Sequence, residues 1–321
     1  MKNVFITGVA GFIGFHTAQR LLSEGCNVMG IDNMSDYYDV TLKEARLNIL
    51  LKHPQFSFWK ADINDTERLI GLFKGTKFDV VCHLAGQAGV RDSIDHPFNY
   101  IDINIRGTNS LFEAMVKTDH KKVVYASSSS VYGKYKDVDQ PASLYGLTKR
   151  VNELQAFYYK ELYGLESIGL RFFTVYGPYG RPDMAIFGFT KKIMEGSSIN
   201  VYNHGELSRD FTYVSDIVDG IFKSLLVCSE GTLKENPDKS PVVFDLGKGS
   251  PDKLMDMITL LGNKIDLPVD MNFVEMQAGD VLETKADIEP AKVALGYSPK
   301  VPLHEGIDHF VDWYKVFYTK K

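Results

Sequence analysis

The stretch TGVAGFIG, residues 7–14, directly follows a short apolar run at residues 4–6. Three glycines spaced GxxGxxG between a strand and a helix are typical of a dinucleotide-binding turn. Gly8 permits the tight turn, Gly11 lets backbone amides approach a pyrophosphate, and Gly14 lets the helix pack on the strand. The N-terminus of that helix attracts the phosphates. The alternative is that the glycines only form a tight corner between a strand and a helix.

An acidic residue completes this pattern. Asp32 ends the second expected strand, 18 residues after Gly14, where a carboxylate can accept hydrogen bonds from the adenosine ribose hydroxyls. The same charge would repel the 2′-phosphate of NADP, so we expect NAD as the cofactor. Asp62, after the third strand, is a candidate for holding the adenine amino group. A helix cap ahead of Asn64 explains Asp62 equally well.

Strand-like and helix-like segments alternate through the first half of the chain. Amphipathic helices are expected at residues 15–25, ending at Gly25, and at residues 64–73, which begin with capping residues. Strands that are apolar on both faces belong to a parallel sheet covered by helices. Such runs occur at residues 3–8, 27–32, 56–62, 80–86, 122–128 and 167–173. We therefore predict an α/β fold with a doubly wound parallel (Rossmann) sheet.

The chain changes character after about Gly177, where prolines and glycines separate shorter elements. We expect a smaller α/β substrate domain there. It should be discontinuous, because residues 216–226 resemble an amphipathic helix and residues 242–249 a strand that return to the sheet. The expected division is an NAD-binding domain at residues 1–176, with parts of 210–250, and a second, smaller domain at residues 177–209 and 251–321. Residues 230–240 are the best candidate for a mobile surface loop.

Composition argues against several other classes of protein. The 321 residues, 44% of them hydrophobic, can bury a sizeable core, and the net charge of -5 is spread without a basic stripe for nucleic acid. Three widely spaced cysteines, Cys26, Cys82 and Cys228, fit reduced core thiols better than disulfides or a metal cluster. No apolar segment reaches the roughly 20 residues that span a bilayer. We expect a cytoplasmic protein with no metal, nucleic-acid or membrane partner.

A tyrosine and a lysine in YGLTK supply a candidate for catalysis. Tyr145 and Lys149 are four residues apart and share a face of a helix. A free phenol has a pKa of about 10, but a neighbouring ammonium and the positive nicotinamide both favour phenolate. Tyr145 could then take a hydroxyl proton while the nicotinamide takes the hydride. Alone, this spacing more often reflects a packed tyrosine beside an exposed lysine, but the upstream dinucleotide pattern favours the catalytic interpretation.

The stretch YASSSSVYG, residues 125–133, places four serines at the carboxyl end of the fifth strand. Ligands of open parallel sheets bind at this end. A serine hydroxyl there can hydrogen-bond the substrate oxygen and pass its proton to the tyrosine. The alternative is that residues 127–130 cap the next helix or satisfy turn amides.

These motifs, together with HLAGQAGVR, LRFFTVYGP and RDFTYVSDIV, resemble the extended short-chain dehydrogenase/reductase family, specifically its nucleotide-sugar epimerases, over nearly the whole chain. Within that group, QAGVR, RFFTVYGPYGRPDMAIF and AGDVLETKAD most resemble UDP-glucuronate 4-epimerases. The resemblance implies NAD that oxidises carbon 4 of a UDP-sugar, a 4-keto intermediate that turns over in the site, and hydride return to the opposite face. The alternatives are another UDP-sugar, such as UDP-glucose or UDP-N-acetylglucosamine, or a non-catalytic NAD-binding sensor.

The resemblance also implies roles for individual residues. Tyr145 is the base, Lys149 lowers its pKa and holds the nicotinamide ribose, and Ser128 is the hydroxyl partner. The implied cofactor contacts are Gly8, Gly11, Phe12, Ile13, Gly14, Asp32, Asn33, Asp62, Ile63, Leu84, Ala85, Gln87, Tyr145, Lys149 and Phe172. The implied substrate contacts are Arg91, Ser127, Ser128, Ser129, Thr174, Arg181, Arg209 and Asp280.

A uronate substrate needs a cation or several donors for its carboxylate. Arg181 follows the sixth strand, and its planar guanidinium can bind a carboxylate at two points. Arg209 resembles the arginine that holds the UDP diphosphate. Either arginine could instead pair with a neighbouring acid, Arg181 with Asp183 or Arg209 with Asp210.

Departures from related enzymes narrow the reaction. Related dehydratases use an Asp-Glu pair after the catalytic hydroxyl residue and related decarboxylases a Glu before VYG, whereas this chain has Ser129 and Ser130. Without a second acid, simple epimerisation is favoured. The segment from Ser128 to Tyr145 is short for the family, and Asp92 stands where relatives often have an aromatic residue, so substrate preference could differ. By analogy, residues 97–117 and 144–163 would form a homodimer interface.

Overall fold

The computed structural model describes residues 1–133, 138, 140–232, 242–277 and 280–319. Its centre is a seven-stranded parallel sheet with the strand order β11-β6-β5-β4-β1-β2-β3. The strands are β1 (Asn3–Thr7), β2 (Asn27–Asp32), β3 (Phe56–Lys60), β4 (Val80–His83), β5 (Lys122–Ser128), β6 (Glu166–Phe172) and β11 (Val242–Leu246). The six predicted strands and the return of residues 242–249 to the sheet are confirmed. The order reverses between β2 and β4 on either side of β1, which creates a ligand crevice at the carboxyl ends.

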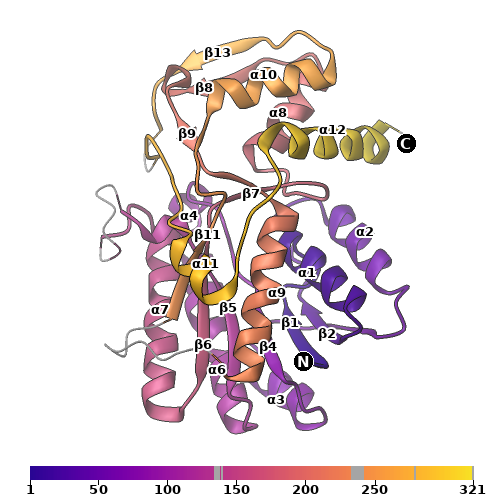
Figure 1. Ribbon diagram of the computed structural model, residues 1–321, viewed down its shortest axis with the longest axis vertical. Helices are drawn as coiled ribbons and strands as arrows, with labels where there is room; N and C mark the ends of the chain where they lie inside the picture. Colours follow the sequence, from indigo (N-terminus) through magenta and orange to yellow (C-terminus); the bar gives the residue numbers. More distant parts are fainter. Residues whose placement is uncertain (134–137, 139, 233–241, 278–279, 320–321) are drawn as a thin grey trace.

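Side chains alternate between the two faces of the sheet, as expected for buried parallel strands. On β1, Val4 and Ile6 contribute to one hydrophobic core, whereas Phe5 contributes to the other. The first core is completed by α1 (Phe12–Ser23), α2 (Val40–Leu50) and α9 (Val214–Glu230), and the second by α3 (Thr66–Lys74), α6 (Gly107–Lys117) and α7 (Leu144–Tyr163). The predicted doubly wound α/β architecture is therefore confirmed (Figure 1).

Local signals place the helix ends near their predicted positions. Two residues after α1, Gly25 has a φ of 78° and its amide donates to the Leu22 carbonyl at 3.0 Å. The α3 helix begins after Asp65, whose carboxylate accepts the Arg68 amide at 3.0 Å. The predicted amphipathic helix at residues 216–226 lies within α9, where Ile217 and Ile221 are buried.

A smaller unit lies beyond the carboxyl ends of the sheet, at the top of Figure 1. Its own core joins Phe187 and Ile193 to Met257, Leu261 and Phe310. It contains α8 (Ala185–Met194), β8 (Ile199–Tyr202), β9 (Ser208–Arg209), β12 (Asp252–Lys253), α10 (Leu254–Ile265), β13 (Met271–Val274) and α12 (Leu303–Thr319). The β13 strand pairs in parallel with β8, and β12 pairs antiparallel with β9.

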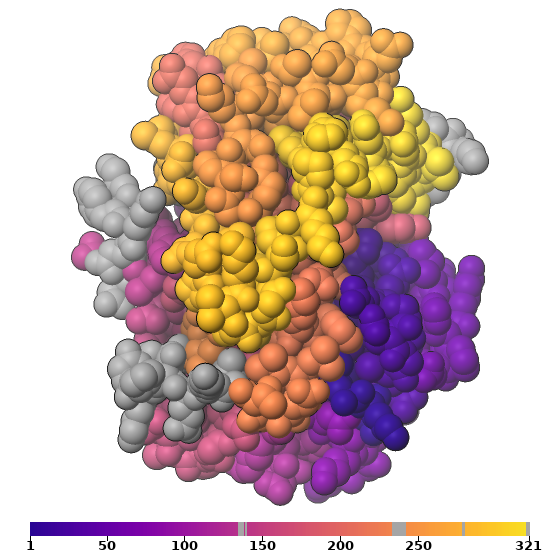
Figure 2. Space-filling view, viewed as in Figure 1, coloured from indigo at the N-terminus to yellow at the C-terminus, as the bar shows by residue number. Residues whose placement is uncertain are grey.

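The last third of the chain is shared between the two units. Figure 2 shows the described residues after α9, in orange and yellow, extending from the top of the molecule down beside α9. Within it, α11 (Glu289–Leu295) contributes Ala291 and Leu295 to the first core instead of the smaller unit's core. The discontinuity that the sequence indicated is thus present, while the boundaries at 177–209 and 251–321 stay a prediction.

Short elements connect these units. A parallel pair, β7 (Thr174–Tyr176) and β10 (Phe211–Tyr213), leads from the sheet toward the smaller unit. The others are α4 (Asp92–Asp95), α5 (Pro97–Tyr100), the π-helix η1 (Ile101–Arg106), and the 3₁₀-helices η2 (Ser129–Val131) and η3 (Asn203–Gly205). Residues 233–240 of the predicted mobile loop lie outside the described residues. Among the helices of the described chain, none is long and apolar enough to cross a bilayer.

Candidate active site

A cavity of about 910 Å³ opens at the carboxyl ends of the sheet strands, between the sheet and the smaller unit. Its lining includes every site residue predicted from the sequence except Asp62. Residues that are far apart in the chain are thereby brought together, from Gly8 to Asp280. One site therefore contains the dinucleotide turn, the serine-rich strand end and the arginines.

The glycine-rich turn has the close backbone contacts that its spacing predicts. Gly8 has a φ of 72°, and a Cβ at this position would lie 2.7 Å from the Ala85 nitrogen. A Cβ at Gly14 would lie 2.1 Å from the Gly8 carbonyl oxygen, and one at Gly11 2.9 Å from the same atom. No side chain caps the α1 N-terminus that begins after Gly11. The turn therefore leaves a backbone-lined surface at a helix N-terminus, which suits a pyrophosphate.

Asp32 is held at the end of β2 by two backbone amides. Its Oδ2 accepts the Ala10 amide at 3.1 Å and its Oδ1 accepts the Met34 amide at 2.8 Å. A carboxylate has about four acceptor sites, so each oxygen can also accept a ribose hydroxyl. Asp62 instead accepts the Asn64 amide at 2.8 Å and the Asn33 side chain at 3.1 Å. The N-cap of α3 is Asp65, so Asp62 forms a local turn and not the helix cap that the sequence also allowed. The adenine contact of Asp62 stays a prediction.

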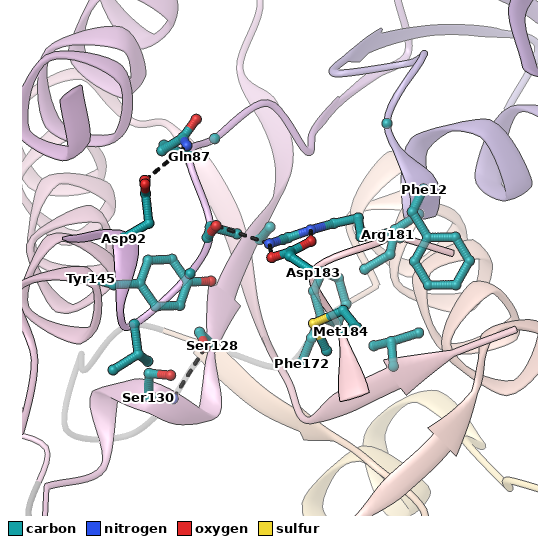
Figure 3. A pocket seen from close by; sticks show the side chains of 18 of the residues that line it. Phe12, Gln87, Asp92, Ser128, Ser130, Tyr145, Phe172, Arg181, Asp183 and Met184 are labelled. Carbon is teal, nitrogen blue, oxygen red and sulfur yellow. Dashed lines mark hydrogen bonds and ion pairs between the residues drawn. The ribbon is translucent and has the colours of Figure 1, made fainter. Parts of the chain in front are cut away.

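Ser128 and Tyr145 meet above the end of β5. Figure 3 shows the phenol of Tyr145 directed toward the space between Ser128 and the Arg181–Asp183 pair. Burial raises the pKa of Tyr145 above its ordinary value, whereas a hydrogen bond with Ser128 and the charge of Arg181 act to lower it. The Ser128 hydroxyl also accepts the Ser130 amide at 3.1 Å, which fixes its position.

Lys149 lies one helical turn after Tyr145 on α7 and lines the same cavity, as the spacing predicts. Its Nζ donates to the Ala126 carbonyl at 3.2 Å. Burial lowers the pKa of Lys149 to about 8. The charge of Arg181 acts to lower the pKa of Tyr145, and a direct effect of Lys149 on that pKa stays a prediction.

Ser127 lines the cavity and also belongs to a buried polar network. Its hydroxyl donates to Glu153 Oε1 at 2.7 Å. Arg171 donates to both oxygens of the same carboxylate at 2.8 Å, and its Nη1 donates to the Tyr132 hydroxyl at 2.8 Å. We infer that Ser127 supports the end of β5. Because Ser127 also lines the cavity, its contact with the substrate stays a prediction. Sequence reasoning missed Glu153 and Arg171, because nothing local in the chain indicates that they pair.

Arg181 lines the cavity, and its guanidinium already donates hydrogen bonds to other groups of the protein. Its Nε donates to Asp183 Oδ1 at 3.0 Å, and its Nη2 donates to Asp183 Oδ2 at 2.5 Å and to the Ala88 carbonyl at 2.9 Å. The pairing of Arg181 with Asp183, one alternative raised by the sequence, is therefore present. Because both residues line the cavity, a ligand carboxylate could still reach the exposed edge of the guanidinium.

Three further predicted substrate residues, Arg91, Arg209 and Asp280, lie close together. Asp280 lies 3.7 Å from Arg91 and 3.9 Å from Arg209, while the Arg91 guanidinium stacks 4.8 Å from the centre of the Tyr202 ring. Arg209 therefore pairs with Asp280 instead of Asp210. Asp210 is fully buried and accepts the amides of Gly249 and Ala286. Arg91 and Arg209 are thus two cations near one partly exposed carboxylate, Asp280, and together they suit a diphosphate.

The cavity also contains residues that the sequence did not single out. Lys43 is buried, donates to Ser35 Oγ at 3.0 Å and lines the cavity near Asp32. Asp92, noted as a departure from relatives, accepts the Tyr100 hydroxyl at 2.9 Å and contacts His96 at 2.9 Å. The sequence gives little indication that Lys43 lies in the site, because a lysine in an amphipathic helix is ordinarily exposed.

Comparison with known proteins places the chain in a family. Residues 4–236 match the family model described as the NAD dependent epimerase/dehydratase family. The chain belongs to this family of NAD-dependent enzymes, with the fold of the extended short-chain dehydrogenases/reductases.

Individual relatives narrow the comparison. The chain is 46% identical to the Methanocaldococcus jannaschii protein MJ1055, over 98% of this chain and 96% of that protein. It is 43% identical to UDP-glucuronate 4-epimerase 4 of Arabidopsis thaliana, over 98% of this chain and 76% of that protein. The crystal structure of Bacillus cereus UDP-glucuronic acid 4-epimerase with UDP-glucuronic acid and NAD superposes with a TM-score of 0.89 at 33% identity, covering 98% of this chain and 100% of that one.

Proposed function

We propose that this chain is a UDP-glucuronate 4-epimerase that interconverts UDP-glucuronate and UDP-galacturonate with bound NAD. The observation that carries the proposal is the joint presence, in one cavity, of the Tyr145–Ser128 pair and of Arg181 directed toward it. The first pair handles a hydroxyl proton and the arginine suits a carboxylate on the same sugar. Similarity to the Arabidopsis and Bacillus epimerases supports the same substrate.

The residues present fit NAD. At Gly8, Gly11 and Gly14 a Cβ would collide with the protein's own backbone, so the turn keeps a helix N-terminus free of side chains that suits a pyrophosphate. Asp32 offers acceptor sites at the end of β2. Lys149 lines the same cavity and would hold the nicotinamide ribose of the bound dinucleotide. When bound, NAD supplies the reversible acceptance of a hydride from carbon 4 of the sugar.

Tyr145 and Ser128 manage the proton in this mechanism. The phenolate of Tyr145 takes the proton from the sugar 4-hydroxyl, directly or through the Ser128 hydroxyl, and returns it when the opposite epimer forms. Burial disfavours that phenolate, so the positive charge of Arg181 is part of what makes it accessible. The Ser130 amide holds Ser128 so that its hydroxyl hydrogen remains available to Tyr145 or the sugar oxygen.

Arg181 and the residues around it orient the sugar. The guanidinium presents a planar set of donors to the C6 carboxylate, and Thr174 and Ser129 supply hydroxyls in the same part of the cavity. Arg209 and Arg91 bind the diphosphate at the other end. With the diphosphate fixed, the sugar can turn between two faces while Tyr145 remains in reach.

A neutral sugar is the second candidate substrate, and one observation favours it. Asp183 already occupies two donors of Arg181, which weakens the attraction for a second carboxylate. UDP-glucose 4-epimerase of Thermotoga maritima is also similar, with 28% identity and a TM-score of 0.86. The retained Tyr145 and Lys149 argue against a sensor without catalytic activity.

A panel of UDP-sugars separates these candidates. Purified protein is incubated without added reductant with UDP-glucuronate, UDP-glucose and UDP-N-acetylglucosamine, and the products are resolved by ion-exchange chromatography. We expect conversion of UDP-glucuronate to exceed that of the neutral sugars at least about tenfold, since a lost charged contact is of this size. Preferential conversion of a neutral sugar would overturn the uronate assignment, and no conversion with NAD retained would favour the sensor.

We also propose a homodimer formed by residues 97–117 and 144–163. The supporting observation is the apolar surface of these helices, on which Phe98 is 78% and Leu162 60% exposed, beside Leu147, Leu154 and Tyr158. Light scattering after size-exclusion chromatography should give twice the chain mass, and Phe98→Glu should reduce it to one chain.

We also propose a cytoplasmic location, which is supported by three unpaired, buried cysteines.

A further inference from the structure

Arg46 is a fully buried arginine that the proposed reaction does not use. It lies on α2 with 0% of its surface exposed, and it forms no ion pair with any carboxylate of the described chain. A buried charge is costly unless all of its donors are satisfied. The partners that satisfy Arg46 therefore indicate what it holds in place.

The guanidinium of Arg46 joins two segments that are far apart in the chain. On one side, Nη1 donates to the Ala10 carbonyl at 2.8 Å, inside the glycine-rich turn. On the other side, Nε and Nη2 donate to the Tyr179 carbonyl at 3.2 and 2.6 Å, and Nη2 also contacts the Gly180 carbonyl at 3.5 Å. The Tyr38 hydroxyl accepts the remaining Nη1 donor at 2.6 Å.

Each of the two segments that Arg46 joins lies next to a residue that we expect to bind a ligand. The Ala10 amide donates to Asp32, the expected ribose ligand, and the Ala10 carbonyl accepts from Arg46, so this one residue connects Asp32 and Arg46. Gly180 directly precedes Arg181, the expected carboxylate ligand. A shift of the Arg46 guanidinium would therefore move both the cofactor turn and the segment that carries Arg181.

The segment before Arg181 is also strained and held from α1. Tyr179 has a φ of 57°, in the left-handed region that a tyrosine adopts only when its surroundings impose it. His16 on α1 donates its Nε2 hydrogen to the Pro178 carbonyl at 2.8 Å. Three successive carbonyls, at residues 178–180, are thus fixed by side chains of the cofactor-binding half.

We propose that Arg46 is a positioning residue that couples the NAD-binding turn to Arg181, so that NAD and a uronate sugar each strengthen the binding of the other. The coupling is reciprocal by thermodynamic linkage, because a ligand that raises the affinity for a second ligand must gain the same factor from it. The inference deepens the proposed function and rests on it, since it takes Arg181 as the carboxylate ligand.

The test uses Arg46→Lys, which keeps the charge but loses the planar set of donors. The first readout is release of labelled NAD from the loaded enzyme after dilution. UDP-glucuronate should slow this release about fivefold or more in the wild type, which is the lower end of typical coupling. UDP, which has no carboxylate, should slow it less. In Arg46→Lys the two ligands should have the same small effect.

A double-mutant cycle distinguishes coupling through Arg181 from general damage. Arg46→Lys should lower kcat/KM for UDP-glucuronate about tenfold when Arg181 is present, and less than about twofold in an Arg181→Gln background. Equal losses in both backgrounds would overturn the proposal. The matched control is Arg20→Lys on α1, where Arg20 pairs with Glu24 at 2.8 Å and should change neither readout.

Two further comparisons distinguish failure of a variant to fold, failure of the proposed function and failure of this inference. If Arg46→Lys does not fold, His16→Gln tests the same clamp, and it should reduce the effect of UDP-glucuronate on NAD release without altering release in its absence. An unchanged effect would refute the clamp. Wild-type protein that does not convert UDP-glucuronate would defeat the proposed function, whereas active wild type with unaltered coupling in Arg46→Lys would defeat this inference alone.

Discussion

Arg181 and Asp183 form a two-point ion pair inside the candidate active site, with Nε to Oδ1 at 3.0 Å and Nη2 to Oδ2 at 2.5 Å. The geometry is the one by which an arginine binds a ligand carboxylate. Asp183 therefore occupies donors that a uronate would use. A substrate carboxylate must either displace Asp183 or bind the edge of the guanidinium that Asp183 leaves open.

Replacing Asp183 tests this competition. Asp183→Asn removes the negative charge but keeps an acceptor of similar shape, so Arg181 should remain in place through its bond to the Ala88 carbonyl. We expect UDP-glucuronate to bind about threefold to tenfold more tightly, with UDP binding unchanged, measured by calorimetry on the NAD-loaded protein. Weaker uronate binding in Asp183→Asn would mean that Asp183 positions Arg181 instead of competing for it.

Tyr145→Phe removes the group that carries the proton. Turnover should fall by at least about 100-fold, because a positioned acid–base residue contributes this much or more. NAD binding and thermal stability should stay near those of the wild type, since the phenyl ring fills the same space. Tyr158→Phe, on the exposed side of the same helix, is the matched control and should retain activity. An active Tyr145→Phe enzyme would refute the assigned role.

Lys149 should make stability depend on pH. Burial lowers its pKa from 10.5 in the unfolded chain to about 8 in the folded protein, so the charged form is disfavoured by folding. The resulting penalty is fully present below pH 8 and is relieved as the pH rises toward 10.5. Lys149→Met should therefore be more stable than the wild type at pH 7 although it is inactive.

Chemical denaturation at two pH values checks this prediction. The stability advantage of Lys149→Met should shrink by roughly 2 kcal/mol between pH 7 and pH 10, from the linkage of one lowered pKa. An advantage that is constant over this range would show that the lysine charge is not the cause.

Tyr125 offers a separate test of buried polarity. Its hydroxyl is buried and has no hydrogen-bond partner among the described residues. Tyr125→Phe should leave the free energy of unfolding unchanged or raise it by about 1 kcal/mol, because an unsatisfied buried group is removed. The control is Tyr159→Phe, whose hydroxyl donates to Glu113 at 2.5 Å, and which should lose about 1 kcal/mol. Destabilisation by Tyr125→Phe would mean that the hydroxyl has a partner in solution.

The sequence predicted those features that are encoded within a few residues. The constrained backbone at Gly8 and Gly14 follows from spacing, as does the shared helix face of Tyr145 and Lys149. Strand and helix alternation predicted the sheet for the same reason, since periodicity reports local burial. Motif resemblance then supplied residues from distant parts of the chain, such as Arg181 and Arg209.

Contacts between distant polar residues were beyond local reasoning. The hydrogen bond from the Ser127 hydroxyl to Glu153, 26 residues later, could not be predicted from either segment alone. Arg46 contacts Tyr179, 133 residues away, and its helix gives no local sign that an arginine would be buried. Only the packing of α2 against the glycine-rich turn and the segment before Arg181 brings these groups together.

One reaction tests the central claim most directly. Purified protein is incubated with UDP-glucuronate in heavy water without reductant, and carbon 4 is followed by proton NMR. We predict that UDP-galacturonate accumulates to a stable ratio with ordinary hydrogen, not deuterium, at carbon 4. Deuterium at that carbon, or unchanged UDP-glucuronate in a sample that converts UDP-glucose, would contradict the account.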